Sequence, residues 1–183
     1  MSQPTTRFSF VATLIAFAAL SRLLPHPPNF APIGAMALFG AAYLPKKWLT
    51  VVVPLVALWL SSLLIDNTLM AQWYDGFVWF SNPWVYVALL GIVGLGWVTL
   101  RRVTLPNVVG SALGASVLFF LVSNFGVWLA YYPNTLAGLT ACYAAAVPFF
   151  HWTLLGDLFF CGVLFGAYEM ALRRGWAVAP SKG

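Results

Sequence analysis

The amino-acid sequence predicts an all-α integral membrane protein with six transmembrane helices and with its N- and C-termini in the cytoplasm. First, 62% of the 183 residues are hydrophobic and only 7% are charged, too few polar residues to cover a water-soluble domain. Second, three doubled basic pairs interrupt the apolar sequence: Lys46-Lys47, Arg101-Arg102 and Arg173-Arg174. Third, the sequence between successive pairs is long enough to cross a bilayer twice, at about 20 residues per crossing.

The basic pairs also predict the orientation. Lys and Arg beside transmembrane helices are retained on the cytoplasmic side during insertion, so all three pairs should lie inside the cell. This role accounts for most of the net charge of +5, and we therefore do not expect nucleic-acid binding. Residues 1–183 should form one multi-pass domain in the inner (cytoplasmic) membrane, in contact with membrane lipids.

The first two predicted helices are joined by an unusual connection. The first covers residues 8–24 and ends at Pro25-His26-Pro27-Pro28, because proline cannot continue a helix. No small-x-small cleavage site follows the apolar run, so we expect a retained helix rather than a signal peptide. The second predicted helix, residues 33–44, is too short to span alone. Irregular backbone at membrane depth must be covered by protein or line a cavity, so residues 27–32 predict a cavity wall.

The remaining four helices are predicted from apolar runs between turn signals, at residues 48–65, 84–100, 107–130 and 148–172. The long connection 66–83 is rich in aromatic residues, and another connection should run from residue 131 to about residue 147. An interfacial belt of Trp and Tyr explains most of these aromatic residues. An aromatic platform that closes over a flat ligand is the alternative.

Several polar residues should meet near the outer face in this topology. Ionisable groups within apolar helices are costly and are usually paired or functional. The candidate substrate-binding residues are Asn29, Asp66, Asn124, Trp128, His151 and Asp157. Each polar group also has a structural alternative: Asp157 could pair with Arg22 or with a backbone donor and so hold the bundle together, Asn124 could bridge two helices, and Asp66 and His151 could be hydrated at helix ends.

Small residues four positions apart allow close helix packing. Such pairs are Ala12 and Ala16, Gly110 and Gly114, and Gly162 and Gly166. We expect them to face inward and pack within the bundle. The alternative for Ala12 and Ala16 is a surface that docks a separate membrane subunit.

Other motifs are missing from the sequence. It contains no Gly-x-x-x-x-Gly-Lys-Ser/Thr, His-Glu-x-x-His, Cys-x-x-Cys or Gly-x-Ser-x-Gly pattern. We therefore expect no ATPase activity, no enzyme activity, no metal site and no cofactor. Cys142 and Cys161 are too few for a disulfide framework, and whether either contacts a ligand stays open.

Short motifs along the whole chain carry a resemblance to a known family. They are Ala12-x-x-x-Ala16, Gly34-Ala-Met-Ala-Leu-Phe-Gly40 before a basic turn, Ser123-Asn124 and Leu155-Gly156-Asp157. In these the chain resembles the substrate-binding S components of energy-coupling factor (ECF) vitamin transporters. More closely, Pro25-His-Pro-Pro-Asn-Phe-Ala-Pro, Ser123-Asn-Phe-Gly-Val-Trp and Pro148-Phe-Phe are similar to segments of an uncharacterised family of small bacterial six-helix membrane proteins related to that group.

The resemblance implies a six-helix bundle of the S-component type and high-affinity uptake of a micronutrient. The ligand would be a vitamin or a related compound, such as cobalamin or another cofactor precursor. It would be bound in an outer pocket lined by the last three helices. The implied partners are an ECF transmembrane scaffold subunit, docked at Ala12 and Ala16, and two ATPases. No motif matches the ligand set of any one vitamin.

Two other functions stay open. The first is a small membrane enzyme acting on a lipid or a cofactor, with His151 and Asp157 as acid and base. Six residues along one helix place these two on different faces, which disfavours a direct pair, although His26 could replace one of them. The second is a structural or assembly subunit whose polar residues only hold helices together.

Overall fold

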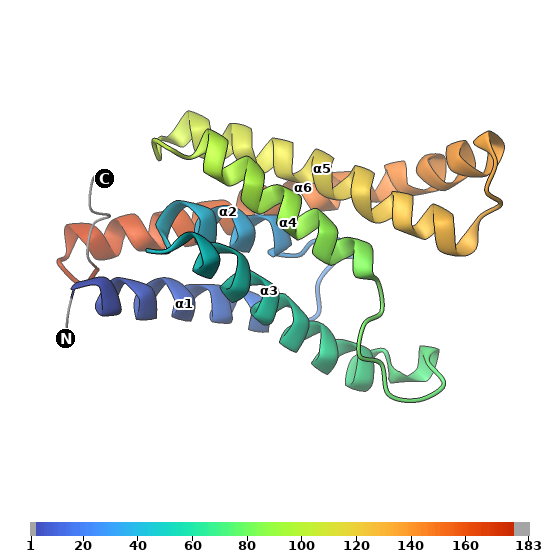
Figure 1. Ribbon diagram of the computed structural model, residues 1–183, viewed down its shortest axis with the longest axis horizontal. Coiled ribbons are helices and arrows are strands. Elements are labelled where there is room, and N and C mark those ends of the chain that lie inside the picture. Colours follow the sequence, from blue (N-terminus) through green and yellow to red (C-terminus); the bar gives the residue numbers. More distant parts are fainter. Residues whose placement is uncertain (1–2, 178–183) are drawn as a thin grey trace.

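The computed structural model describes residues 3–177. The regular secondary structure of this part of the chain is entirely helical, as predicted (Figure 1). Its six α-helices are α1 (Gln3–Ser21), α2 (Ile33–Tyr43), α3 (Lys47–Leu64), α4 (Pro83–Thr99), α5 (Leu105–Tyr131) and α6 (Leu136–Arg173). Two short helical turns follow α3: η1 (Ile65–Leu69), which is a π-helix, and η2 (Ala71–Trp73), which is a 3₁₀-helix.

Three of the described helical segments are long and apolar enough to cross a membrane. They are Lys47–Leu69, which joins α3 to η1, and the helices α5 and α6. The segments Arg7–Ser21, Ile33–Tyr43 and Pro83–Thr99 are also apolar but shorter. This length and composition indicate that the protein associates with a membrane.

The three basic pairs lie at one end of the bundle, which we call the basic end. The α2–α3 and α4–α5 connections lie toward the end at which the chain begins and α6 finishes (Figure 1). Arg7 Nε donates to Tyr43 O at 2.7 Å, so the start of α1 is tied to the end of α2. The ring of Tyr168, in the last turns of α6, packs on Tyr43 with 4.1 Å between centroids.

Helix α2 lies at the centre of the bundle. It contacts α1, α3, α4, α5 and α6, and every residue from Ile33 to Gly40 is buried. A helix that is apolar on all sides is stable only when neighbours cover all of it. Its 11 residues rise only about 16 Å, about half the thickness of a bilayer's hydrocarbon core. The N-terminus of α2 therefore begins inside the protein rather than at its surface.

The buried N-terminus of α2 is capped by a carboxylate from another helix. Asp157 of α6, only 2% exposed, accepts hydrogen bonds from the backbone amides of Gly34 and Ala35. It also accepts a hydrogen bond of 2.7 Å from Ser116 Oγ on α5. The first amides of a helix have no partner in the helix and carry partial positive charge, so an anion stabilises them. Asp157 thus joins α2, α5 and α6, rather than pairing with Arg22.

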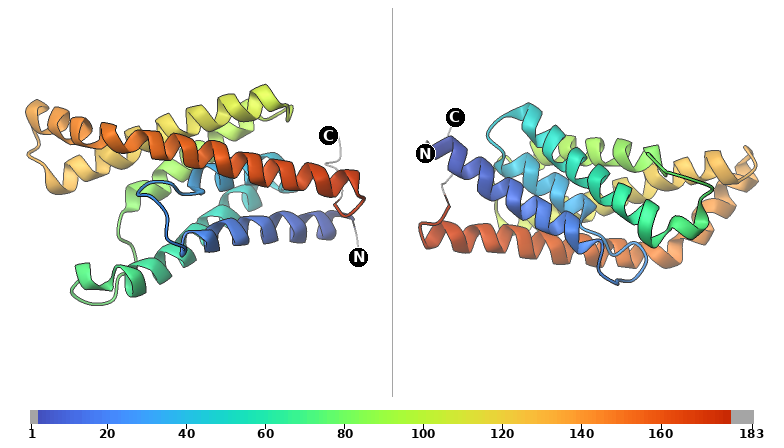
Figure 2. Two further views of the ribbon diagram at one scale, coloured as in Figure 1. Left: turned by 180° about the vertical axis from the view of Figure 1, so that it is seen from behind. Right: turned by 90° about the horizontal axis from the view of Figure 1, so that it is seen from below.

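The predicted bounds of the sixth helix differ from the structure. Helix α6 begins at Leu136, with Pro148 inside it, so the predicted connection up to residue 147 shrinks to the four residues 132–135. The Ala-rich segment before Pro148 forms helix readily, and Thr135 Oγ1 caps its first turn by accepting from Gly138 N at 3.1 Å. Seen from behind, α6 runs the length of the molecule, and its first turns lie with the end of α5 beyond the other helices (Figure 2).

Of the four paired glycines, only Gly114 faces a neighbouring helix, where a Cβ atom would lie 3.2 Å from Leu95 Cδ2. A Cβ atom built at Gly110, Gly162 or Gly166 meets nothing within 4 Å, so these three do not face inward as expected. Closer approaches occur at glycines outside the pairs, such as Gly126 against Trp84 and Gly156 against Ala31. A spacing of four identifies a helix face but not the direction in which it points, because these helices are apolar all round. On α1, Ala16 is exposed and Ala12 is partly buried.

The cap on α2 predicts that Gly34→Ala destabilises the protein. The added Cβ would lie 2.5 Å from Asp157 Oδ1, so the carboxylate or the helix must move. We expect a loss of about 1–3 kcal/mol, the usual cost of overpacking a buried contact. Thermal unfolding of the detergent-solubilised protein measures this loss. Gly162→Ala is the matched control, since its Cβ has open space, and equal melting temperatures for the two variants would contradict the prediction.

Candidate functional site

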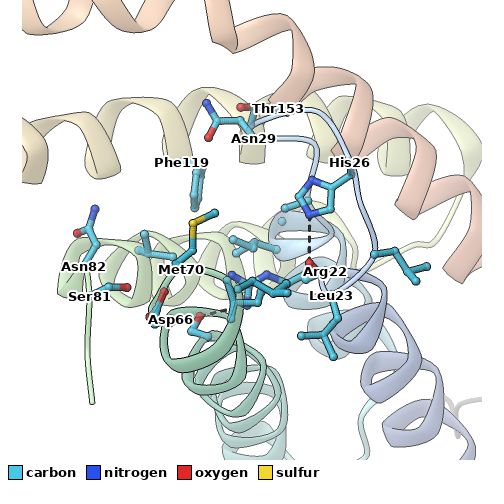
Figure 3. A pocket seen from close by; sticks show the side chains of 18 of the residues that line it. Arg22, Leu23, His26, Asn29, Asp66, Met70, Ser81, Asn82, Phe119 and Thr153 are labelled. Atoms are coloured by element: carbon cyan, nitrogen blue, oxygen red, sulfur yellow. Dashed lines mark hydrogen bonds between the residues drawn. The ribbon is translucent and has the colours of Figure 1, made fainter. Parts of the chain in front are cut away.

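A cavity lies at the end of α1–α4 opposite the basic end, and we call it the polar cavity (Figure 3). It has a volume of about 460 Å³ and lies among the α1–α2 connection, η1, the start of α4 and the middle of α5 and α6. Its polar lining residues are Arg22, His26, Asn29, Ser62, Asp66, Ser81, Asn82, Tyr86, Thr153 and Asp157. Apolar side chains, among them Ile65, Met70 and Phe119, form the rest of the wall.

The α1–α2 connection forms one wall of the polar cavity. Its prolines prevent helix formation, and Asn29 adopts a φ of 67°, a left-handed conformation that asparagine tolerates better than most residues. The connection reaches the middle of α6 because residue 156 is glycine: a Cβ there would lie 3.0 Å from Ala31 N. Asn29 and Ala31 line the cavity, so residues 27–32 do contribute the wall that the sequence predicted.

Arg22 supplies a positive charge to the polar cavity. Its Nη1 atom donates to Leu58 O at 3.3 Å, to Ser62 Oγ at 3.1 Å and to Ser61 Oγ. These bonds tie the end of α1 to the last turns of α3. They leave Nε and Nη2, on the same guanidinium group, free to donate hydrogen bonds to a bound molecule. The Ser62 side chain is also hydrogen-bonded to Tyr86, so α4 joins the same group.

Asp66 supplies the opposing negative charge. The π-helical turn η1 is closed by Met70 N donating to Ile65 O at 2.9 Å, and Asp66 is its second residue. Only 9% of Asp66 is exposed, yet within residues 3–177 no donor forms a hydrogen bond to its carboxylate and no ion pair joins it to Arg22. The unpaired oxygens are accessible from the cavity, because within the described residues every fully buried side-chain oxygen has a hydrogen-bond partner. The carboxylate lines the cavity, where donors of a bound molecule would satisfy it (Figure 3).

A smaller side pocket of about 170 Å³ adjoins the polar cavity. The two share Asn29, Asn82, Val85, Phe119 and Thr153 in their walls. Ser123 and Asn124 of α5 belong to the side pocket alone. Asn124 Nδ2 donates to Phe120 O in its own helix at 2.8 Å, which fixes the amide and leaves its oxygen available. The two cavities together extend from η1 to the middle of α5.

The six candidate residues from the sequence separate into three groups. Asn29, Asp66 and Asp157 line the polar cavity, and Asn124 lines the side pocket beside Asn29. His151 and Trp128 line neither. His151 is exposed on α6, with its ring centroid 4.7 Å from that of Trp152. Trp128 Nε1 donates to Pro133 O at 3.0 Å, at the far end of α5.

Comparison with known families gives one match. The model of a family of unknown function, DUF6580, matches residues 2–179. The chain belongs to the DUF6580 family. Comparison with the curated proteins and with the solved structures gives no match. The match covers all six helices, so the fold described above is that of a DUF6580 member. Because the family has no known function, we infer the function from the chemistry of the cavities.

Several cavity residues of this DUF6580 protein were not among the six candidates. Ser62 precedes Asp66 by four residues in an apolar segment. This spacing puts both residues on one helix face and is a signal that could have identified Ser62. Asn82 stands before Pro83, a common start of a helix, and its Oδ1 accepts from Trp84 N at 3.0 Å. Thr153 likewise precedes Asp157 by four residues within the predicted helix 148–172, so the same spacing places both on one helix face.

The arrangement offers charges and hydrogen bonds rather than metal coordination. Within residues 3–177, no group of three His, Cys, Asp or Glu side chains could hold a metal ion. The cavity of this DUF6580 protein can instead present a guanidinium group, a carboxylate, amides and hydroxyls to one molecule. Apolar walls around a few convergent polar groups are typical of small-molecule sites.

The bonds made by Arg22 predict that Arg22→Met destabilises this DUF6580 protein. The change leaves the Leu58 carbonyl and two serine hydroxyls without their charged donor, and we expect a loss of about 2–4 kcal/mol. Thermal unfolding in detergent is the measurement. Arg102→Met removes an exposed arginine and should leave the melting temperature nearly unchanged. A smaller effect at position 22 than at position 102 would exclude this role of Arg22.

Proposed function

We propose that this DUF6580 protein is the substrate-binding membrane subunit of an ECF-type transporter, which captures a small micronutrient in the polar cavity. The observation that carries the proposal is the Asp66 carboxylate, which faces a cavity of about 460 Å³ and accepts no hydrogen bond from the described residues 3–177. A molecule in the cavity that brings hydrogen-bond donors would pair with that charge.

The dimensions and chemistry of the cavities support capture of a small polar molecule. Ligand pockets commonly enclose about 300–1,000 Å³, the range into which the polar cavity falls. Arg22 can bind an anionic or carbonyl group, and Asp66 can bind an amine or another donor. Asn29 and Asn82, on opposite sides of the cavity, can both donate and accept (Figure 3). The ligand class that fits best therefore carries both donors and acceptors on a partly apolar body.

The proposed topology has six spans with both termini in the cytoplasm. The gathering of all three basic pairs at one end supports it, because such residues are retained inside the cell. The polar cavity then opens toward the outer face. In this topology α2 and the α1–α2 connection together make one crossing, and the irregular backbone is tolerated because it lines a cavity.

The energising partners in the proposal are a transmembrane scaffold subunit and two ATPases. The exposed Ala16 and the partly buried Ala12 would form the docking face on α1.

Two observations favour binding over catalysis by His151 and Asp157. His151 lies outside both the polar cavity and the side pocket, and the Asp157 carboxylate already accepts from Ser116 and two α2 amides.

Native mass spectrometry of gently purified protein tests the proposal. We expect the wild-type protein to retain a small molecule and Asp66→Asn to retain it about tenfold less, because a charged hydrogen bond is lost. Asp75→Asn is the matched control, since Asp75 lies outside the cavity. If the wild-type protein retains no small molecule, or if both variants retain it equally, the proposal fails.

Thiol labelling in intact cells tests the topology. In a variant without Cys142 and Cys161, an impermeant maleimide should label Asn134→Cys and Asp75→Cys. It should label Val103→Cys, beside Arg101-Arg102, only after the cells are permeabilised. All three positions are exposed, so access depends on the side of the membrane. Labelling of Val103→Cys in intact cells would reverse the proposed orientation.

A further inference from the structure

A second cavity lies at the basic end, and we call it the basic cavity. It has a volume of about 450 Å³ and lies between the end of α2, the start of α3 and the end of α4. The side chains of Lys47 and Arg101 contribute to its wall, although they come from different basic pairs. The partner residue of each pair, Lys46 or Arg102, does not line it. One residue of each pair therefore lines the cavity, and its neighbour in sequence lies outside it.

The basic cavity has an uncompensated positive charge. None of the four acidic residues of the chain lines it, and the described ion pair of Glu169 is with Arg173 at the end of α6. Helix α3 also begins at this cavity, with Lys47 as its first residue, and no side chain caps its N-terminus. Two cations and the positive end of a helix dipole therefore converge without a carboxylate from the protein.

The wall of the basic cavity is fixed by hydrogen bonds and ring contacts. Trp97 Nε1 donates to Thr50 Oγ1 at 3.0 Å, and Thr50 Oγ1 donates to Lys47 O at 2.6 Å. Lys47 is exposed, and its Nζ atom lies over the Trp97 ring, 5.8 Å from the ring centroid, so the ring favours an ammonium position at the cavity. Helices α2 and α4 approach closely beside it, because a Cβ at Gly96 would lie 2.7 Å from Ala41 Cβ.

We propose that the basic cavity binds a phosphate group between Lys47, Arg101 and the N-terminus of α3. Arginine and lysine are the side chains that bind phosphate best, and helix N-termini add backbone donors. Apolar residues such as Ala42, Leu44 and Val98 complete the wall, so acyl chains could lie beside the phosphate. A phospholipid headgroup and a soluble phosphate share this chemistry. Basic pockets between transmembrane helices at the cytoplasmic surface are known to take phospholipid headgroups.

The test compares two double variants that remove the same charge from the same two turns. Lys47→Gln/Arg101→Gln removes the cavity residues, and Lys46→Gln/Arg102→Gln removes their neighbours. The detergent-solubilised proteins are titrated with phosphatidylglycerol, with diacylglycerol of the same acyl chains and with inorganic phosphate, and adducts are counted by native mass spectrometry. Gel filtration and circular dichroism establish that each variant is folded. If the cavity double variant does not fold, the single changes Lys47→Gln and Lys46→Gln replace the pairs.

We expect wild-type protein to retain phosphatidylglycerol over diacylglycerol, and the cavity variant to retain it about tenfold less than the neighbouring variant. Loss of inorganic phosphate alone in the cavity variant would also support the site and would identify a soluble source. Equal retention by the two variants, or equal binding of phosphatidylglycerol and diacylglycerol with no inorganic phosphate bound, would overturn the proposal.

Discussion

The structure depends on the burial of one helix end. Helix α2 is too short to cross a bilayer, so its N-terminal amides lie where water cannot reach them freely. The carboxylate of Asp157, held by Ser116, satisfies the amides of Gly34 and Ala35 and thereby joins α2 to α5 and α6. Without this cap, the central helix would leave polar amides unpaired in an apolar interior, at a cost of about 1–3 kcal/mol each. Both the packing around α2 and the polar cavity beside its N-terminus follow from it.

The same constraint explains why a cavity forms where it does. Because α2 begins inside the bundle, the chain before it must return from the end of α1 without helical structure. The prolines of this connection prevent helix formation, and the positive φ of Asn29 turns the chain back toward α2. Arg22 at its start and Asp66 on η1 then lie in the wall of one space, together with Asn82. At the other end of α2, the turns to α3 and from α4 to α5 bring two cations to the basic cavity.

Much of the fold could be predicted from the sequence because its signals are local. Apolar runs bounded by Pro25, Pro83 and the basic pairs predicted the helices, and the short second run predicted a wall of irregular backbone. The start of α6 could not be predicted in this way, because Pro148 reads as a helix start although tertiary packing on α5 carries the helix through it: Tyr143 Oη donates to Leu121 O at 2.6 Å. For the cavities, depth along each helix predicted the level at which Asp66, Asn124 and Asp157 lie, and the proline-rich connection predicted the wall to which Asn29 belongs. Which face of α6 points into the bundle, and therefore leaves His151 outside both cavities, depends on packing that the sequence alone does not specify.

The cap on α2 has a consequence for how the chain is made. The ribosome completes α2 more than a hundred residues before it reaches Asp157. At about 5–20 residues per second, this delay is roughly 6 to 25 seconds. During that time the N-terminal amides of the nascent α2 lack the carboxylate of Asp157, so α2 cannot adopt its final packing. The emergence of α6 therefore completes the cap on α2, because it brings Asp157 to the amides of Gly34 and Ala35.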